Sequence, residues 1–393
     1  MTQLTFPKDF LWGTSTSAFQ IETAVYSDWK GLKAPDGTVL ERTIDHEKHR
    51  QEDAKIISSL GNSYRCSLDW SRLQRGPMQP LEAAVVDEYR NFLGELNDSN
   101  VKVMLVLHHF ANPDWFASQG GWKSPSAVEH FNDYAKKMVE SFGDLVSLWN
   151  TINEPTVYVT SAYIAGFFPP HKHNPIAAKK VLENMKRAHQ AAYRTIKEKN
   201  PESPVGISDN TMVFKGENIL GKVPARVSEK IYLDYVPDQF KEVDFIGLSY
   251  YGRVCFDPNL IMKINRPGKL DKMGRPHDDM WEYYPEGLKE TLLRFHKRYG
   301  KPVIMTENGC CTNDDNLRIK FIKDHLRYAH EAIQEGVDLK GYYHWSTFDN
   351  WELQLGRKYR FGLVDVNPET LERTPKPSAA FYAGIARANT LKI

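Results

Sequence analysis

The sequence predicts an α/β fold, a single-domain (β/α)8 TIM barrel with extended rim loops over residues 1–393. Three observations predict this class. Eight short apolar runs recur along the chain, amphipathic stretches fill most of the intervals between them, and the turn Gly-x-Gly-x-x-Gly is absent. Because that turn opens a doubly wound sheet, the open sheet is the less favoured alternative.

The apolar runs are typical of strands buried on both faces of a parallel sheet. Most are bounded by turn residues and are apolar at consecutive positions rather than at every second one. In chain order, the predicted strands cover residues 10–16, 63–70, 101–109, 146–154, 205–209, 244–251, 303–307 and 341–345.

Helical patterns separate these strands. The first, over 45–60, begins with Asp45 as a capping residue and stops at Gly61. Pro175 and Pro285 stand where a first helical turn is expected. The remaining predicted helices cover residues 83–97, 126–142, 175–199, 285–299, 316–335 and 376–389, with a shorter and weaker one at 227–235.

The chain is longer than the fold requires, since a minimal barrel needs about 250 residues. We expect the surplus in loops, notably 24–44, 155–175, 211–243 and 252–283. None of these is of low complexity, and no linker rich in Gly, Ser or Pro divides the chain, which favours one domain.

Charge and cysteine content narrow the class of protein. The chain has 51 basic and 50 acidic residues, which gives no reason to expect nucleic acid or an anionic membrane as a partner. Cys66, Cys255, Cys310 and Cys311 lack CxxC spacing, so we expect reduced thiols and no zinc site. No leader-like segment is visible and no apolar run reaches about 18 residues, which predicts a cytoplasmic protein.

Polar residues gather where the predicted strands end, which is where barrels of this class build their active sites. Glu154 ends one strand and precedes Pro155, which we expect to hold it extended. Glu307 ends another and is followed by Gly309, which can turn the chain. In the fourth and seventh strands these carboxylates face each other, so we expect about 5 Å between them, as in retaining glycosidases, rather than about 6.5–9.5 Å.

Three further residues are interpreted from their position. Arg65 lies on a buried strand and needs a partner, for which a rim carboxylate is the nearest choice; its charge would keep that carboxylate ionised. His109 is placed to hydrogen-bond a substrate, whereas His108 should point to the other face because strand residues alternate.

Aromatic residues at strand ends indicate a carbohydrate ligand. Trp345, Trp351 and Tyr251 offer a platform for the C–H face of a sugar ring. A metal site is the competing interpretation of the His and Glu residues, but the sequence has no HExxH and no ladder of carboxylates. We therefore expect no metal and no cofactor.

At these residues the sequence resembles glycoside hydrolase family 1, the β-glucosidase family, over nearly its whole length. No single motif would identify the family, but the occurrence of all the motifs in this order is specific for it. The motifs are FLWGTSTSAFQIE at 10–22, YRCSLDWSR at 64–72, LHHF at 107–110, WNTINEP at 149–155, DFIGLSYY at 244–251, TENG at 306–309, GYYHWS at 341–346 and DNWE at 349–352.

The resemblance implies a role for each matching residue. Glu154 matches the general acid/base and Glu307 the nucleophile of a two-step retaining mechanism, with Arg65 and Tyr251 beside the nucleophile. It also implies a cis peptide between the Trp and Ser of GYYHWS. The positions that match the family's sugar-binding residues are Gln20, His109, Asn153, Tyr251, Trp345 and Glu352, of which Gln20 and Glu352 grip distal hydroxyls and Asn153 contacts the 2-hydroxyl.

The sequence departs from the family pattern at two site positions. Ser249 stands where the family typically has Asn, so one hydrogen bond near the nucleophile should change. Leu353 stands where a Trp usually follows the sugar-binding Glu, which bears on the choice of sugar. Glu352 is kept, and Tyr359 and Phe361 occupy the downstream positions at which phosphosugar members have Lys and Tyr, so a phosphorylated substrate is not expected.

The resemblance implies an exo-acting β-glycosidase, namely a β-glucosidase that also has β-galactosidase and β-fucosidase activity, whose partner is a small β-glycoside or oligosaccharide. Two alternatives stay open: a transglycosylase on the same site, and a carbohydrate-binding barrel without activity, which the presence of both carboxylates disfavours. The sequence leaves open the preferred sugar among glucose, galactose, fucose and mannose, the aglycone, and whether the chain forms an oligomer.

Overall fold

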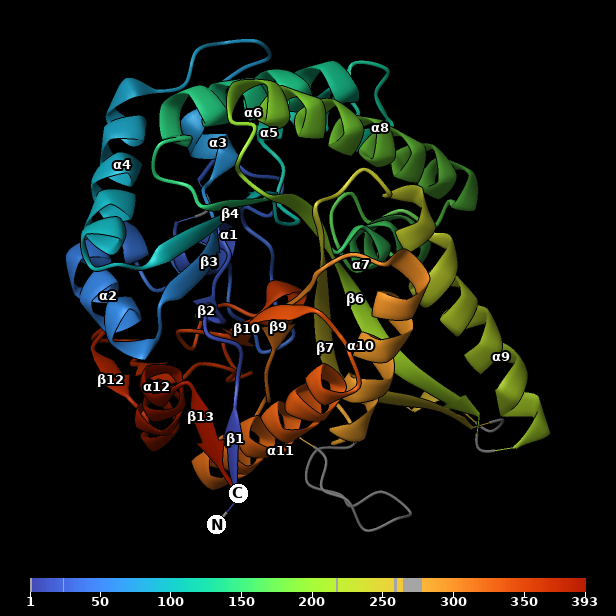
Figure 1. The fold of residues 1–393 in the computed structure, drawn as a ribbon. Helices are drawn as coiled ribbons and strands as arrows, with labels where there is room; N and C mark the ends of the chain where they lie inside the picture. The colour runs from blue at the N-terminus through green and yellow to red at the C-terminus, as the bar shows by residue number, and fades with distance from the viewer. Residues whose placement is uncertain (1, 24, 217, 258–259, 264–277) are drawn as a thin grey trace.

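The computed structural model describes residues 2–23, 25–216, 218–257, 260–263 and 278–393, and within them eight parallel strands close into a barrel (Figure 1). The neighbours around the barrel are β6, β5, β4, β3, β2, β10, β9 and β7, and a β6–β7 pairing closes it. The strands are β2 (Leu11–Ser15), β3 (Ser63–Ser67), β4 (Lys102–His108), β5 (Leu148–Asn153), β6 (Val205–Gly216), β7 (Phe245–Asp257), β9 (Val303–Asn308) and β10 (Leu339–Trp345). The predicted fold class is confirmed.

Helices surround the barrel and bury one face each against it (Figure 1). In α6, for example, Phe131, Tyr134, Met138 and Phe142 recur at helical spacing and are fully buried. The longer helices are α2 (His46–Leu60), α4 (Ala83–Asp98), α6 (Ala127–Phe142), α8 (Pro175–Lys199), α9 (Ile219–Lys230), α10 (Glu286–Tyr299), α11 (Asp315–Gln334) and α12 (Pro377–Ala388). Short helices at the strand ends are α1 (Ala18–Ile21), α3 (Trp70–Leu73), α5 (Asp114–Ser118) and α7 (Pro155–Val159).

A separate apolar cluster fills the barrel near the start of its strands. It consists of Leu11, Met104, Leu148, Phe245, Ile304 and Tyr343. Gly13 makes room for the Tyr343 ring, since a Cβ there would lie 2.2 Å from it. The phenol of Tyr343 shares a hydrogen bond of 2.6 Å with Ser63. This packed floor lies below the strand ends that carry the polar residues.

The ends of α2 differ from the prediction in detail. Asp45 does not cap the helix: its backbone is left-handed (φ +52°), and its carboxylate pairs with Arg42 and Lys48 at 2.9 Å each. Both cations contact Oδ2, and Oδ1 has no hydrogen-bond partner among the described residues, so the carboxylate is turned away from the N–H groups of the first helical turn. Gly61 ends the helix as predicted, but its backbone is extended. The position requires glycine because a Cβ would lie 2.2 Å from the carbonyl oxygen of Trp12. Pro285 precedes α10 rather than opening it.

Two predicted loops contain regular structure. In 211–243 and 252–283, β6 and β7 continue past the barrel as a parallel pair as far as Gly216 and Phe256. The helix predicted at 227–235 is wrong in its start: α9 begins at Ile219 and passes through Pro224, and a π-helical turn, η3 (Ile231–Tyr235), follows. The backbone of β8 (Leu260–Lys263) pairs antiparallel with β7. The rest of the 252–283 prediction lies partly outside the described residues.

The two ends of the chain lie side by side. β1 (Gln3–Thr5) pairs antiparallel with β13 (Thr390–Lys392) at the end of the barrel where β2 begins (Figure 1). No disulfide involves Cys66, Cys310 or Cys311 within the described residues. None of the helices in the described ranges is long and apolar enough to cross a membrane.

Candidate active site

The two strand-end glutamates lie at the carboxyl ends of β5 and β9. Both are almost fully buried. Glu307 is part of β9, whereas Glu154 follows β5 and directly precedes α7, without a capping hydrogen bond from its side chain. Glu154 is not extended, as predicted, but left-handed (φ +44°, ψ +63°). Pro155 disfavours only the right-handed helical region for the residue before it, and the left-handed conformation lets the strand turn at once into a helix that begins with Pro155.

Both carboxylate oxygens of Glu307 accept a strong hydrogen bond. Arg65 donates to Oε1 at 2.7 Å and Tyr251 donates to Oε2 at 2.7 Å. Arg65 is fully buried, and its ion pair with Glu307 is the predicted pairing with a rim carboxylate. Burial and then the charge of Glu307 raise the pKa of Tyr251 well above its usual value, so its hydroxyl remains a donor. Glu307 is therefore held as a charged, fixed carboxylate.

Arg65 also organises the neighbouring strand ends. It donates to Ser15 at 2.9 Å and to Oδ1 of Asn153 at 2.5 Å. The amide of Asn153 in turn lies 3.0 Å from Nε2 of His109. Burial, followed by the charge of Arg65, lowers the pKa of His109 well below its usual value, so the ring is neutral.

If Nε2 of His109 accepts from Asn153, the proton of the ring is on Nδ1. Nδ1 is buried and has no hydrogen-bond partner among the described residues. This donor is therefore available to a ligand. His108 lies on the other side of the strand, where it contacts Asn112 and Trp122, in line with its predicted structural position.

Glu154 has the opposite surroundings to Glu307. Its Oε1 accepts one hydrogen bond of 3.1 Å from Asn210, and no cation pairs with it within the described part of the chain. Burial, and then the negative charge of Glu307, raise the pKa of Glu154 to about 8, against smaller opposing effects of Asn210 and Ser249. Glu154 is therefore protonated at neutral pH. Ser249 acts on this carboxyl and donates no hydrogen bond to Glu307.

Asn210 and Asp209 are site residues that the sequence reasoning missed. Both lie in β6, the strand whose end received no candidate. Asp209 accepts from the hydroxyl of Thr156 at 2.6 Å and so ties β6 to α7, the helix that directly follows Glu154. Burial raises the pKa of Asp209 to about 7. The available signal was the polar run Asp209-Asn210-Thr211 directly after an apolar strand.

Gln20 and Glu352 form a second polar group beside the carboxylates. The amide of Gln20 donates to the carbonyl of Trp351 at 2.8 Å and lies 3.5 Å from Oε2 of Glu352. Burial and the charge of Glu307 raise the pKa of Glu352 to about 8. The charge of Glu307 raises the pKa of both Glu154 and Glu352, so the structure brings all three predicted acidic residues together.

The predicted aromatic platform divides into two parts. Trp345 and Tyr251 pack with Cys311 and Phe361 in a cluster of their own, and the Trp345 ring lies 5.7 Å from that of His109. The Trp345–Ser346 peptide is cis, as the resemblance implies. Trp351 instead packs in the main core, and its indole N–H donates to the carbonyl of Leu353. The N–H of Trp351 is therefore not directed at a ligand.

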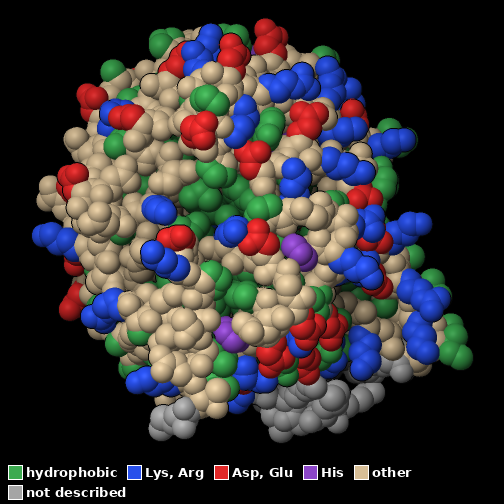
Figure 2. All heavy atoms as spheres, viewed as in Figure 1, with side chains coloured by type: hydrophobic (Ala, Val, Ile, Leu, Met, Phe, Trp, Pro, Cys, Tyr) green, Lys and Arg blue, Asp and Glu red, His purple; other side chains and the backbone are tan. Residues whose placement is uncertain are grey.

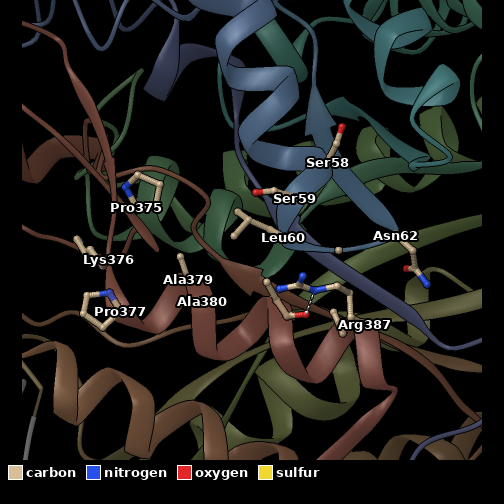
Figure 3. A pocket seen from close by; sticks show the side chains of 13 residues that line it. Ser58, Ser59, Leu60, Asn62, Pro375, Lys376, Pro377, Ala379, Ala380 and Arg387 are labelled. Atoms are coloured by element: carbon tan, nitrogen blue, oxygen red, sulfur yellow. Dashed lines mark hydrogen bonds between the residues drawn. The ribbon is translucent and has the colours of Figure 1, made fainter.

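Within the described ranges, neither a metal centre nor a second cavity competes with these residues as a functional site. Among the described residues, no group of three or more His, Cys, Asp or Glu side chains is arranged to hold a metal ion. A hollow of about 730 Å³ lies between α2 and α12, at the opposite end of the barrel from the glutamates (Figure 3). It is lined mainly by small side chains, and the hydroxyls of Ser58 and Ser59 already donate to helix carbonyls. It offers no group for chemistry.

Known proteins are similar to this chain in both sequence and fold. A sequence model described as Glycosyl hydrolase family 1 matches residues 2–218 and 234–391. Beta-glucosidase A of Acetivibrio thermocellus is 30% identical over 446 residues, which cover 99% of this chain and 100% of the relative. A Beta-galactosidase of Pyrococcus woesei is 31% identical over 485 residues, with 94% of each chain covered.

Solved structures give the same result. The beta-glycosidase from Pyrococcus horikoshii superposes with a TM-score of 0.89 and 32% identity, covering 100% of this chain and 97% of that one. The Family 1 b-glucosidase from Thermotoga maritima in complex with isofagomine lactam gives 0.90 and 28%, with 99% and 100% covered.

Proposed function

Because the chain belongs to glycosyl hydrolase family 1, we propose that this glycoside hydrolase is a retaining, exo-acting β-glycosidase with one catalytic domain over residues 1–393. The proposed substrate is a small β-glycoside or oligosaccharide with a terminal β-D-glycosyl residue. The observation that carries the proposal is the contrast between the two buried glutamates: Glu307 is paired with a cation, and Glu154 is protonated.

In the first proposed step, a carboxylate oxygen of Glu307 attacks the anomeric carbon of the sugar. The bond from that carbon to the leaving oxygen breaks as a glycosyl ester with Glu307 forms. Glu154 gives its proton to the leaving oxygen, so the aglycone departs as a neutral alcohol. The hydrogen bonds from Arg65 and Tyr251 fix the attacking carboxylate in place.

In the second proposed step, Glu154, now charged, takes a proton from water while the water oxygen attacks the anomeric carbon. The ester bond breaks, Glu307 is released as a carboxylate, and the sugar keeps its β configuration. Retaining enzymes place the two carboxyl groups about 5–5.5 Å apart. The influence of Glu307 on the pKa of Glu154 supports such a close approach.

The sugar ring is proposed to lie between the polar groups and Trp345. Gln20 and Glu352 would bind distal hydroxyls, Asn153 the 2-hydroxyl, and the free Nδ1 donor of His109 a further hydroxyl. Trp345 would pack against the C–H face of the ring. Solved relatives from Thermotoga maritima hold isofagomine lactam or castanospermine, which supports a small-molecule ligand.

The test combines a substrate panel with product analysis. Release of nitrophenol from nitrophenyl β-glucoside, β-galactoside, β-fucoside and β-mannoside would identify the preferred sugar, and the matching α-glycosides are the control. Proton NMR of the first product then reports its anomeric form. Initial formation of the α-anomer, or no turnover of any β-glycoside, would overturn the proposal. Product analysis with an added acceptor sugar separates hydrolysis from transglycosylation.

A further inference from the structure

An exposed apolar stripe runs along α9 and η3. Its members recur every four residues on the outer side of the helix, and Ile219, Val223 and Val227 expose 79%, 65% and 54% of their surface. The full stripe consists of Ile219, Leu220, Val223, Val227, Ile231 and Tyr235. The segment 219–233 falls between the two stretches that match the family, so every member of the stripe except Tyr235 lies outside the matched sequence.

Basic residues flank this stripe on one side. Lys222, Arg226 and Lys230 repeat at the same four-residue spacing and are exposed. Within the part of the chain that the structure describes, none of the three has an ion-pair partner. Figure 2 shows basic and hydrophobic side chains interleaved along the edge of the molecule that α9 occupies, at the right of the view.

The acidic residues of the same segment are engaged elsewhere. Glu229 and Asp234 both pair with Arg294 of α10, Asp234 at 2.9 Å, and Arg298 contacts Asp234 at 3.2 Å. Their charge is therefore neutralised against the body of the protein. The residues of α9 that are most exposed are all apolar or basic, although the whole chain has a net charge of +1. The near-equal numbers of basic and acidic residues in the whole sequence hide this local excess of positive charge on α9.

The surface continues onto the start of α8. Ile176 is 85% exposed, and it lines a shallow hollow together with Tyr235, Lys179, Lys180 and Glu183, whose carboxylate lies 3.8 Å from the ammonium group of Lys186. The combined face thus repeats the pairing of apolar and basic side chains on a second helix. Tyr232, on η3, contacts the hydroxyl of Thr160 at 3.0 Å, and Thr160 follows α7. The face therefore lies beside the mouth of the barrel, on the β5–β6 side.

We propose that this face, made by α9, η3 and the first turns of α8, binds the surface of an anionic lipid bilayer. A helix with an apolar stripe and a basic flank lies in a membrane interface with its apolar side chains among the acyl chains and its cations at the headgroups. A second copy of the chain is a poorer occupant. Two copies packed through this face about a twofold axis would bring the same unpaired cations together.

The test is co-sedimentation of the full chain with vesicles. We expect binding to vesicles of phosphatidylcholine mixed with phosphatidylglycerol, weaker binding at high salt, and little binding to phosphatidylcholine alone. The triple change Lys222→Gln, Arg226→Gln and Lys230→Gln should lower partitioning about a hundredfold, since each cation near an anionic surface contributes about fivefold. The change Val223→Asp with Val227→Asp should abolish it.

Matched variants control for charge, hydrophobicity and folding. Lys8→Gln, Lys55→Gln and Lys102→Gln remove the same net charge from exposed positions elsewhere, and Val39→Asp alters an exposed Val outside the face. These variants should bind as the unchanged protein does. Hydrolysis of a soluble nitrophenyl glycoside without vesicles should be equal in all variants, and it tests the proposed function independently.

Three outcomes would overturn the proposal. The first is no binding to anionic vesicles, and the second is equal loss of binding in the control triple variant. The third is a dimer in light scattering that the Val223→Asp and Val227→Asp change dissociates, without any vesicle binding, because that result assigns the face to a second copy.

Discussion

The side-chain amide of Asn210 donates a hydrogen bond of 3.1 Å to Oε1 of Glu154. This bond favours the charged form of a carboxyl whose pKa burial and Glu307 raise to about 8. In the proposed mechanism the protonated form of Glu154 gives the proton, so activity should fall as pH rises through about 8. Asn210→Ala should move this alkaline limit of kcat/KM upward by about one pH unit, since a hydrogen bond to a charged group contributes about 1.5 kcal/mol.

A pH profile of nitrophenyl glycoside hydrolysis measures this shift. Asn97→Ala is the control. Asn97 lies on α4, away from the site, and its side-chain amide donates to the carbonyl of Leu145. An alkaline limit that moves down in Asn210→Ala would contradict the assignment of Glu154 as the acid.

Glu307→Gln should lower kcat by at least about 10⁴-fold on every β-glycoside, because no other group takes the place of a lost nucleophile. Turnover of nitrophenyl glycosides measures the loss. The exposed Glu202→Gln variant should keep full activity. Wild-type rates in Glu307→Gln would show that the roles of the two glutamates are assigned wrongly.

Glu154→Ala should spare the first step only for leaving groups that depart without a proton. With a dinitrophenyl glycoside, the glycosyl ester should therefore accumulate and give a burst of product. Azide, which attacks without a general base, should restore turnover and yield a β-glycosyl azide. The rescue is followed by release of dinitrophenol and by NMR of the azide product. An α-glycosyl azide would be incompatible with a retaining path.

Glu352→Gln should lower kcat/KM by about tenfold for a glucoside, as expected for a lost hydrogen bond between a neutral carboxyl group and a hydroxyl. For a 6-deoxyglucoside, which lacks the 6-hydroxyl, the same variant should lower kcat/KM by less if Glu352 contacts that hydroxyl. The comparison of the two substrates separates a contact from a general loss of folding. Glu372→Gln, at an exposed position, is the matched control. Equal losses for both substrates would exclude a contact with that hydroxyl.

Gly309→Ala should destabilise the fold by about 3 kcal/mol or more, because the added Cβ would overlap the backbone carbonyl of Trp345, 1.7 Å away. Gly94→Ala is the matched control: it lies in α4 with nothing within 4 Å of its Cβ, so a gain of up to about 1 kcal/mol is expected. Urea unfolding of the three proteins measures both effects. An unchanged midpoint in Gly309→Ala would mean that the β9 and β10 ends separate easily.

Much of the fold and part of the site follow from local sequence. The strands of the barrel are apolar on consecutive positions because both faces are buried, so each is visible in a short window. The pairing of Arg65 with a rim carboxylate follows from the cost of an unpaired buried cation, and Glu307 provides that partner.

Other contacts depend on how strands align, which a single sequence does not show. The register of β5 on β6 shifts between Asn150 and Asn153, and the backbone N–H of Glu154 then bonds the carbonyl of Ser208. This shift sets Asn210 beside Glu154. The early start of α9 was missed because Pro224 interrupts its pattern, while Asn218 caps the helix through its side chain.

The β1–β13 pairing has a practical consequence. It places both strands at the start of the barrel, whereas Glu154 and Glu307 lie where the strands finish. A linker that continues from either strand would therefore attach the enzyme to a bead or a chip with its catalytic side facing the bulk solution. Immobilisation through one strand or the other should give the same turnover per molecule.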